Sequence, residues 1–153
     1  MEIGLQPRLN FHKAGPEAVR ALQGLENQIA RSGLDKPLIT LVRLRASQIN
    51  GCAYCIDHHT REARKAGEDE RRLSMLIAWR DTAFSDSCFN DRERAALEWT
   101  EAVTLVAQTH VPDEVWNRVK PHFTPEELVD LTLLVSTVNA WNRFAISFRN
   151  TPV

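Results

Sequence analysis

The sequence has no excess of one charge, no long apolar run and only 6 glycines in 153 residues. Its 19 Lys+Arg against 20 Asp+Glu give a formal net charge of -1, which excludes the electrostatic signature of a non-specific nucleic-acid binder or a polybasic membrane-surface protein. No stretch approaches the roughly 20 apolar residues that span a bilayer. The N-terminal segment lacks the basic-then-apolar order of a signal peptide. We therefore expect a single domain over residues 1–153, a cytoplasmic location, and neither nucleic acid nor membrane as a partner.

Strand patterns are also missing, because no segment alternates apolar and polar residues for long enough to indicate a sheet. Apolar residues recur instead at steps of three and four. The expected helices are one opened by Gly15-Pro16 and closed by Gly33, one from Asp35 to Asn50, one from about Cys52 to Lys65, a short one around Leu73–Trp79, and three that start at Asn90, at Pro112 and at Thr124. Asp81–Phe89 is expected to be a loop. The pattern predicts an all-α, single-domain bundle of about six or seven helices.

The expected faces of these helices indicate burial and self-association. On the first helix, Leu22, Leu25 and Ile29 fall on one stripe, and on the helix that starts at Asn90 we expect Val106 to be buried. The second and last helices are apolar on more faces than one small bundle can bury. Because exposed apolar patches of that size normally mark interfaces, we expect a homo-oligomer, at least a dimer.

The chemically informative stretch is NGCAYCIDHH at residues 50–59. At about 100° per residue, Cys52, Cys55 and His59 fall within an arc of roughly 60° on one helix face. Asn50-Gly51 places the pair at a helix N-terminus, where free N–H groups and the helix dipole favour thiolate over thiol. His59 can take the thiol proton. This layout favours reversible dithiol chemistry, although a chance pair on a buried face stays open.

Other uses of the two cysteines are constrained by their surroundings. A zinc site needs four ligands, and beyond Cys52, Cys55 and one histidine only Cys88, Asp57 or a distant histidine could supply the fourth. A c-type haem needs histidine directly after the second cysteine, where Ile56 stands. A thioredoxin fold would place the pair after a strand, and no such strand is predicted. We expect no metal and no organic cofactor.

The stretch LVRLRASQINGCAYCIDHHTREARKAG at 41–67 resembles the carboxymuconolactone decarboxylase superfamily, in particular its AhpD-like alkylhydroperoxidase branch. The resemblance continues through ALEWTEA at 96–102 and VNAWNRF at 138–144. It implies an all-α oligomer, a trimer or hexamer, that reduces hydroperoxides without a cofactor. In this pattern Cys55 is the peroxidatic cysteine, Cys52 the resolving cysteine and His59 the proton relay.

The chain departs from that pattern at one position. The relay usually begins with a glutamate twelve residues before the first cysteine, and Thr40 stands there. Either another carboxylate substitutes, with Glu101 as first candidate and Glu98 as second, or water suffices, or only dithiol exchange remains. The leading hypothesis is therefore a thiol-dependent peroxidase whose partners are a hydroperoxide and an external thiol or disulfide-reductase system. The alternatives are a redox-sensing or structural helical oligomer and a metal-binding module.

Overall fold

The computed structural model describes residues 6–84 and 88–152, and throughout this part of the chain the regular elements are helical. The elements in order are α1 (Phe11–Ala14), α2 (Pro16–Ala30), α3 (Lys36–Asn50), α4 (Ala53–Lys65), α5 (Glu70–Met75), the 3-10 segment η1 (Leu76–Phe84), α6 (Asp91–Thr104), α7 (Val106–Thr109), α8 (Asp113–Val119), the 3-10 segment η2 (Lys120–His122) and α9 (Pro125–Ser147). The all-α prediction is confirmed. Among the described helices, none is long and apolar enough to cross a membrane.

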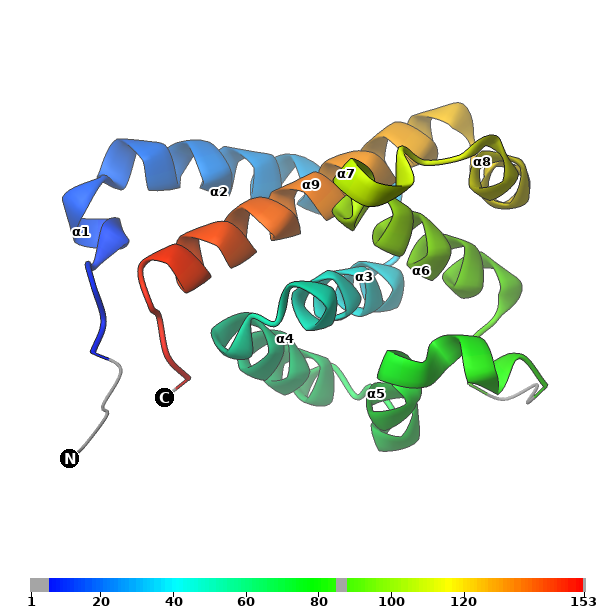
Figure 1. Ribbon diagram of the computed structural model, residues 1–153, viewed down its shortest axis with the longest axis horizontal. Helices are drawn as coiled ribbons and strands as arrows, with labels where there is room; N and C mark the ends of the chain where they lie inside the picture. The colour runs from blue at the N-terminus through cyan, green and yellow to red at the C-terminus, as the bar shows by residue number, and fades with distance from the viewer. Residues whose placement is uncertain (1–5, 85–87, 153) are drawn as a thin grey trace.

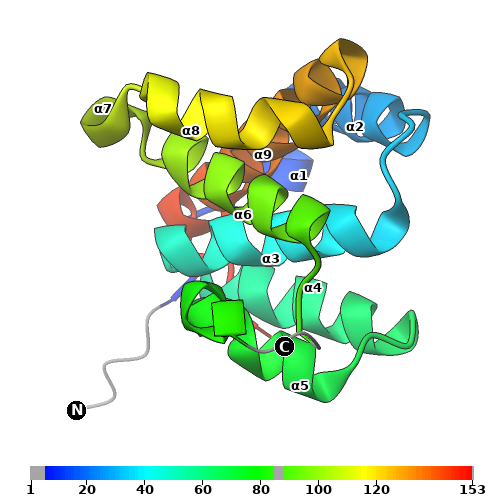
Figure 2. The same cartoon turned by 90° about the vertical axis from the view of Figure 1, so that its right-hand side faces the viewer.

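Helix α3 lies at the centre of the bundle. It packs against α4 on one side and against α6 and α9 on the other, and α2 runs along α9 (Figures 1 and 2). Its side chains Leu41, Val42 and Ala46 have no exposed surface. One face of α3 joins a core shared with α2, α6, α8 and α9, and the other joins a core shared with α4, α5 and α6. The nearly continuous apolar character of α3 follows from this double packing.

The helix starts follow local side-chain chemistry. Asn90 and Glu93 form a reciprocal capping box at α6, and Thr124 and Glu127 form another at α9. Between α3 and α4, Gly51 adopts a left-handed conformation with φ +66°, which costs glycine little and a β-carbon-bearing residue more. This tight link sends α4 back along α3 and fixes the position of Cys52.

Several predicted details are wrong. Residues 81–84 belong to η1 rather than to a loop, while residues 85–87 of that predicted loop lie outside the described part. The chain leaves α6 after Thr104 and re-enters a short helix, α7, and Val106 is 51% exposed instead of buried. On α2, Leu25 is exposed although it was predicted to lie on the apolar stripe, and the adjacent Glu26 is partly buried instead.

Candidate functional site

Cys52 and Cys55 form a disulfide at the start of α4, with their Cα atoms 5.3 Å apart. Cys52 is the N-cap residue, outside the helical conformation, and Cys55 lies in the first turn. The backbone N–H of Cys55 donates to Sγ of Cys52 at 3.3 Å, so the sulfur takes the place that a serine or aspartate oxygen usually has at a helix start. The predicted juxtaposition of the two sulfurs at a helix N-terminus is thus present, in the oxidised form.

The two sulfurs differ in their access to solvent. Cys52 is 1% exposed and packs with Cys55 against Ala145 of α9. Cys55, in contrast, lines a cavity of about 840 Å³ enclosed by α1, α2, α3, α4 and α9. A molecule that enters this cavity meets Cys55, not Cys52.

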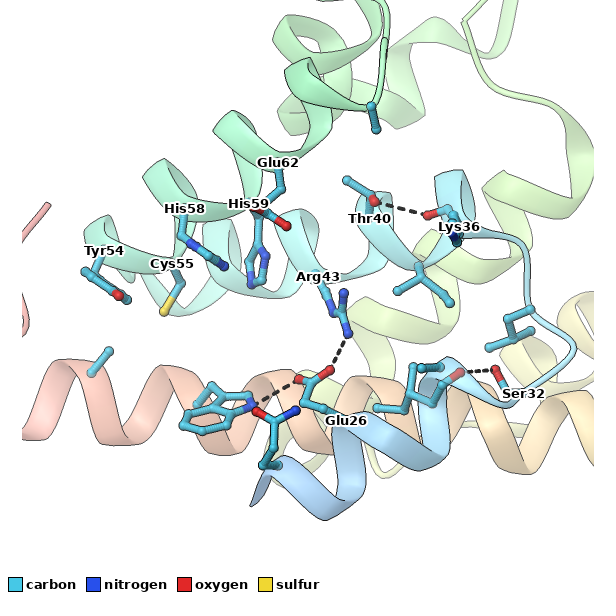
Figure 3. Close-up of a pocket in the computed structure, with 18 of the residues that line it drawn as sticks. Glu26, Ser32, Lys36, Thr40, Arg43, Tyr54, Cys55, His58, His59 and Glu62 are labelled. Atoms are coloured by element: carbon cyan, nitrogen blue, oxygen red, sulfur yellow. Dashed lines mark hydrogen bonds and ion pairs between the residues drawn. The ribbon is translucent and has the colours of Figure 1, made fainter. Parts of the chain in front are cut away.

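The cavity follows the inner face of α4 from its first turn to its end. Cys55, His59 and Ala66 all line it, a run of about 16 Å at 1.5 Å per residue. Tyr54 and His58 stand beside Cys55, with their rings parallel and their centroids 6.3 Å apart (Figure 3). The opposite walls combine apolar side chains, among them Phe11, Ile29 and Trp141, with polar and charged ones, among them Glu26 and Arg43.

His59 lies one turn beyond Cys55 on the same wall of the cavity (Figure 3). Burial, the positive charge of Arg43 and the neighbouring His58 lower the pKa of His59 to about 3. The ring is therefore neutral at pH 7 and has a lone pair free to accept a proton. The structure brings Cys55 and His59 to the same cavity, as the sequence indicates.

Thr40 also lines the cavity, but its hydroxyl is committed to its own helix. Oγ1 of Thr40 donates to the carbonyl oxygen of Lys36 at 3.0 Å (Figure 3). A hydroxyl is in any case no proton acceptor at neutral pH, so this position does not supply the base that the AhpD-like pattern places there.

Glu101, the first candidate to replace the glutamate missing at position 40, lies outside the cavity. It accepts hydrogen bonds from Trp79 Nε1 at 2.7 Å, from Arg45 and from Arg80, and it is not among the residues that line the cavity. Burial opposes ionisation of Glu101, but the hydrogen bonds from Trp79 and Arg80 and the charges of the two arginines outweigh it and lower the pKa of the carboxyl. The expectation that Glu101 serves His59 is thus corrected, because α6 directs this side chain towards η1. The second candidate, Glu98, is bound by Arg118.

Three carboxylates line the cavity, namely Asp35 at the N-cap of α3, Glu62 of α4 and Glu26 of α2, and Glu26 is the one paired with Arg43. It forms an ion pair with Arg43 of α3 and accepts a 3.0 Å hydrogen bond from Nε1 of Trp141 on α9 (Figure 3). The sequence contained a signal for it: Val19, Leu22, Glu26 and Ile29 are spaced by three, four and three residues, so Glu26 interrupts an apolar stripe.

A buried polar network holds the turn that carries Cys52. Nδ2 of Asn50 donates to Oδ1 of both Asn139 and Asn142 at 2.9 Å, and Nδ2 of Asn142 donates to Ser47 at 3.1 Å. Asn142 and Ser47 have no exposed surface. Because a buried amide without partners is costly, these bonds tie the end of α3 to α9 at one geometry.

The remaining cysteine takes no part in this arrangement. Cys88 is a buried free thiol in the core with Trp79 and Leu97. Within residues 6–84 and 88–152, no three His, Cys, Asp or Glu side chains are grouped so as to hold a metal ion.

Comparison with known proteins gives the same family as the sequence resemblance. Residues 16–102 match the carboxymuconolactone decarboxylase family. An uncharacterised protein of Bacillus subtilis, YdfG, is 38% identical over 146 residues, which are 95% of this chain and 97% of that protein. The alkyl hydroperoxide reductase AhpD of Coxiella burnetii is 41% identical over 51 residues, which are 33% of this chain and 29% of that protein.

A solved structure shares the whole architecture. It comes from an Agrobacterium tumefaciens protein of unknown function for which an AhpD-type role in antioxidant defence has been suggested. The identity is 41%, the TM-score is 0.89, and the match covers 97% of this chain and 99% of that one.

Proposed function

This chain belongs to the carboxymuconolactone decarboxylase family, in its AhpD-like branch, and we propose that it is a thiol-dependent peroxidase that reduces organic hydroperoxides. One observation carries the proposal: a cysteine that can form a disulfide with its neighbour lines a large cavity beside a neutral histidine. The chemistry needs only the two cysteines and a proton carrier.

The first step takes place at Cys55. Its thiolate attacks the distal oxygen of the hydroperoxide, the O–O bond breaks, and Cys55 becomes a sulfenic acid while the substrate leaves as an alkoxide. The thiol proton passes through His59 to the alkoxide as the alkoxide forms, which gives the alcohol; because the pKa of His59 is about 3, the ring carries this proton only in transit. The sulfur is oxidised by two electrons and the peroxide is reduced by two.

The second step uses Cys52. Its sulfur attacks the Cys55 sulfenic acid, water leaves, and the disulfide forms. An external dithiol then attacks Sγ of Cys55, since this is the sulfur that lines the cavity, and expels Cys52 as a thiolate. The N–H of Cys55 that already points at the Cys52 sulfur would stabilise this leaving group. The second thiol of this dithiol then attacks the mixed disulfide and releases Cys55 as a thiolate, so both cysteines are restored.

The size and lining of the cavity support an organic substrate. Its volume of about 840 Å³ is within the range of pockets for small organic molecules and far larger than hydrogen peroxide requires. The apolar part of its lining, with Phe11, Ile29 and Trp141, would stabilise a hydrocarbon tail.

Stoichiometric oxidation tests the proposal. We expect reduced, reductant-free protein to lose two thiols per chain on addition of one equivalent of cumene hydroperoxide, with one equivalent of alcohol formed. Cys55→Ser should abolish the reaction, Cys52→Ser should stop at a sulfenic acid that dimedone traps on Cys55, and Cys88→Ser should behave as the unmodified chain. An unchanged thiol titre in the unmodified chain would refute the proposal.

A second candidate function is dithiol exchange without peroxidase turnover, and Thr40 favours it because it leaves the relay without its usual carboxylate. Catalytic assays separate the two. Continuous alcohol production with excess dithiothreitol supports the peroxidase, whereas reduction of a small disulfide substrate without peroxide turnover supports the exchange activity.

Two further proposals concern the setting of the protein. We propose that it works in the cytoplasm, where thiol systems can reduce the disulfide, and that it self-associates. Trp116 and Val129 are 40% and 70% exposed beside a second, apolar pocket formed by α8, η2 and α9, a surface that assembly would cover. Light scattering on the purified chain gives the oligomeric state, and a monomer would contradict the second of these proposals.

A further inference from the structure

The ion pair between Glu26 and Arg43 has no place in the two-cysteine chemistry described above, yet both residues line the same cavity as Cys55. Their side chains are only 20% and 26% exposed. An ion pair at this depth is costly to desolvate and by itself adds little stability. Its position in the same cavity as Cys55 and His59 therefore indicates a role in their chemistry.

The geometry of α3 and α4 places the arginine level with the histidine. The two helices run antiparallel from the turn at Gly51 (Figure 3). Arg43 lies eight residues before this glycine and His59 eight residues after it. Cys55 is four residues nearer the turn than His59, an axial offset of about 6 Å at 1.5 Å per residue. Arg43 and Cys55 line the same cavity, and the Arg43 charge already acts on His59 between them along α4.

The guanidinium of Arg43 lies between His59 and the carboxylate of Glu26 (Figure 3). Figure 3 shows the Arg43 side chain on the side of His59, with Glu26 beyond it. Both carboxylate oxygens of Glu26 are engaged, one by Arg43 and the other by Trp141. Glu26 is therefore an anchor for the guanidinium rather than a free base that could accept a proton from His59.

Other charged and titratable groups face the cavity, but they are placed differently. The full set is His12 of α1, Glu26 of α2, Asp35 at the N-cap of α3, Lys36 and Arg43 of α3, and Tyr54, His58, His59 and Glu62 of α4. Lys36 is seven residues, about 10 Å along α3, farther from the turn than Arg43. Of the two cations in this set that stay charged at neutral pH, Arg43 is thus the one near Cys55.

We propose that Arg43 is the group that favours the thiolate form of Cys55, and that Glu26 is a positioning residue that holds the guanidinium level with His59. The inference rests on the proposed function only in taking Cys55 as the reactive thiol. Loss of the thiol proton, to His59 or to water, leaves a negative sulfur that the guanidinium stabilises. A cation thereby does part of the work that the AhpD-like pattern assigns to a glutamate at the position of Thr40.

The test is the ionisation of Cys55, measured without peroxide. Reduced full-length protein is alkylated with iodoacetamide over a range of pH, and mass spectrometry follows the peptide that contains Cys55. We expect Arg43→Gln to raise the pKa of this thiol and to slow its alkylation at pH 7 by about tenfold, the change in thiolate fraction that one pKa unit gives. Arg43→Lys should retain most of the reactivity, and Arg61→Gln, on the exposed part of α4, should change nothing.

The double variant Glu26→Gln/Arg43→Gln distinguishes charge from structural damage. Arg43→Gln leaves the negative charge of Glu26 in the cavity, and the double variant removes it, so the thiol pKa should be highest in Arg43→Gln and lower in the double variant. Structural damage would instead expose Cys52 and Cys88 and speed the alkylation of all three cysteines.

Two outcomes would overturn the inference: a thiol pKa in Arg43→Gln equal to that of the unmodified chain, or one in the double variant as high as in Arg43→Gln. Because neither readout uses peroxide, failure of the proposed peroxidase activity would leave these results interpretable.

Discussion

Trp141 and Glu26 are 115 positions apart in the sequence, and Nε1 of the indole donates a 3.0 Å hydrogen bond to the carboxylate. The bond fastens α9 to α2 along the wall of the cavity. It also occupies the carboxylate oxygen that does not bind Arg43. Together with the ion pair to Arg43, this contact gives both carboxylate oxygens of Glu26 a partner where the residue interrupts the apolar stripe of α2.

Trp141→Phe keeps the aromatic packing and removes this donor. We expect the free energy of unfolding to fall by about 1–2 kcal/mol, because a partly buried carboxylate loses a partner. Urea denaturation of the oxidised protein measures the change. Trp116→Phe, at an exposed position on α8, is the matched control and should have a smaller effect. Equal losses in the two variants would contradict a role for the hydrogen bond.

Asn142→Ala should destabilise the protein by about 1–3 kcal/mol, the range for burial of unsatisfied polar partners. Asn142 is fully buried, and its loss removes one hydrogen bond from Asn50 and one from Ser47. Chemical denaturation checks the magnitude. Asn117→Ala on the exposed surface of α8 should stay within about 0.5 kcal/mol of the unmodified chain. A similarly small effect at Asn142 would show that the network does not hold the turn.

His59 makes stability depend on pH in a definite direction. Its pKa is about 3 in the folded chain and about 6.5 when unfolded, so between these values the unfolded state binds a proton that the folded state does not. Stability should therefore fall as the pH drops below 6.5, by up to about 1.4 kcal/mol per pH unit. Urea unfolding at several pH values, compared with His59→Gln, isolates this contribution. Parallel curves for the two proteins below pH 6 would contradict it.

The three cysteines of the reduced protein should react at different rates. All three are buried, at 1%, 5% and 3% exposure for Cys52, Cys55 and Cys88, but of the three only Cys55 lines the cavity. We expect iodoacetamide to modify Cys55 first in the native state and all three at similar rates in urea. Site-resolved mass spectrometry gives the order. Faster labelling of Cys52 would mean that the cavity is not the route to the disulfide.

Glu101→Gln should lower stability without changing the chemistry at Cys55. The substitution weakens the hydrogen bonds from Trp79, Arg45 and Arg80, for an expected loss of about 1–3 kcal/mol. Alkylation of Cys55 should be unchanged, because Glu101 lies outside the cavity. Glu17→Gln, in an exposed pair on α2, is the control. A change in the reactivity of Cys55 would restore Glu101 as a member of the relay.

The sequence predicted the features that local chemistry determines. The helix starts at Asn90 and Thr124, the break at Asn50-Gly51 and the two cysteines at a helix start depend on neighbours within a few residues, and all are present. The all-α class follows in the same way from periodicity.

Features that depend on packing between distant helices were not predicted. Leu25 and Glu26 are adjacent on α2, and periodicity alone does not decide which of them faces inward; a donor on α9 and an arginine on α3 stabilise the glutamate there. The direction of Glu101 was missed for the same reason, since Trp79 and Arg80 of η1 are about twenty residues away in the chain.

The sulfur of Cys52 begins α4 as well as closing the disulfide. A mutation of Cys52 affects both the cap of α4 and the disulfide, and different replacements preserve different ones of these two properties. A serine would preserve an acceptor for the first turn and lose electron transfer, whereas an alanine would lose both. Loss of the disulfide through Cys52→Ser should therefore leave the start of α4 intact, whereas Cys52→Ala should also weaken the helix at this end.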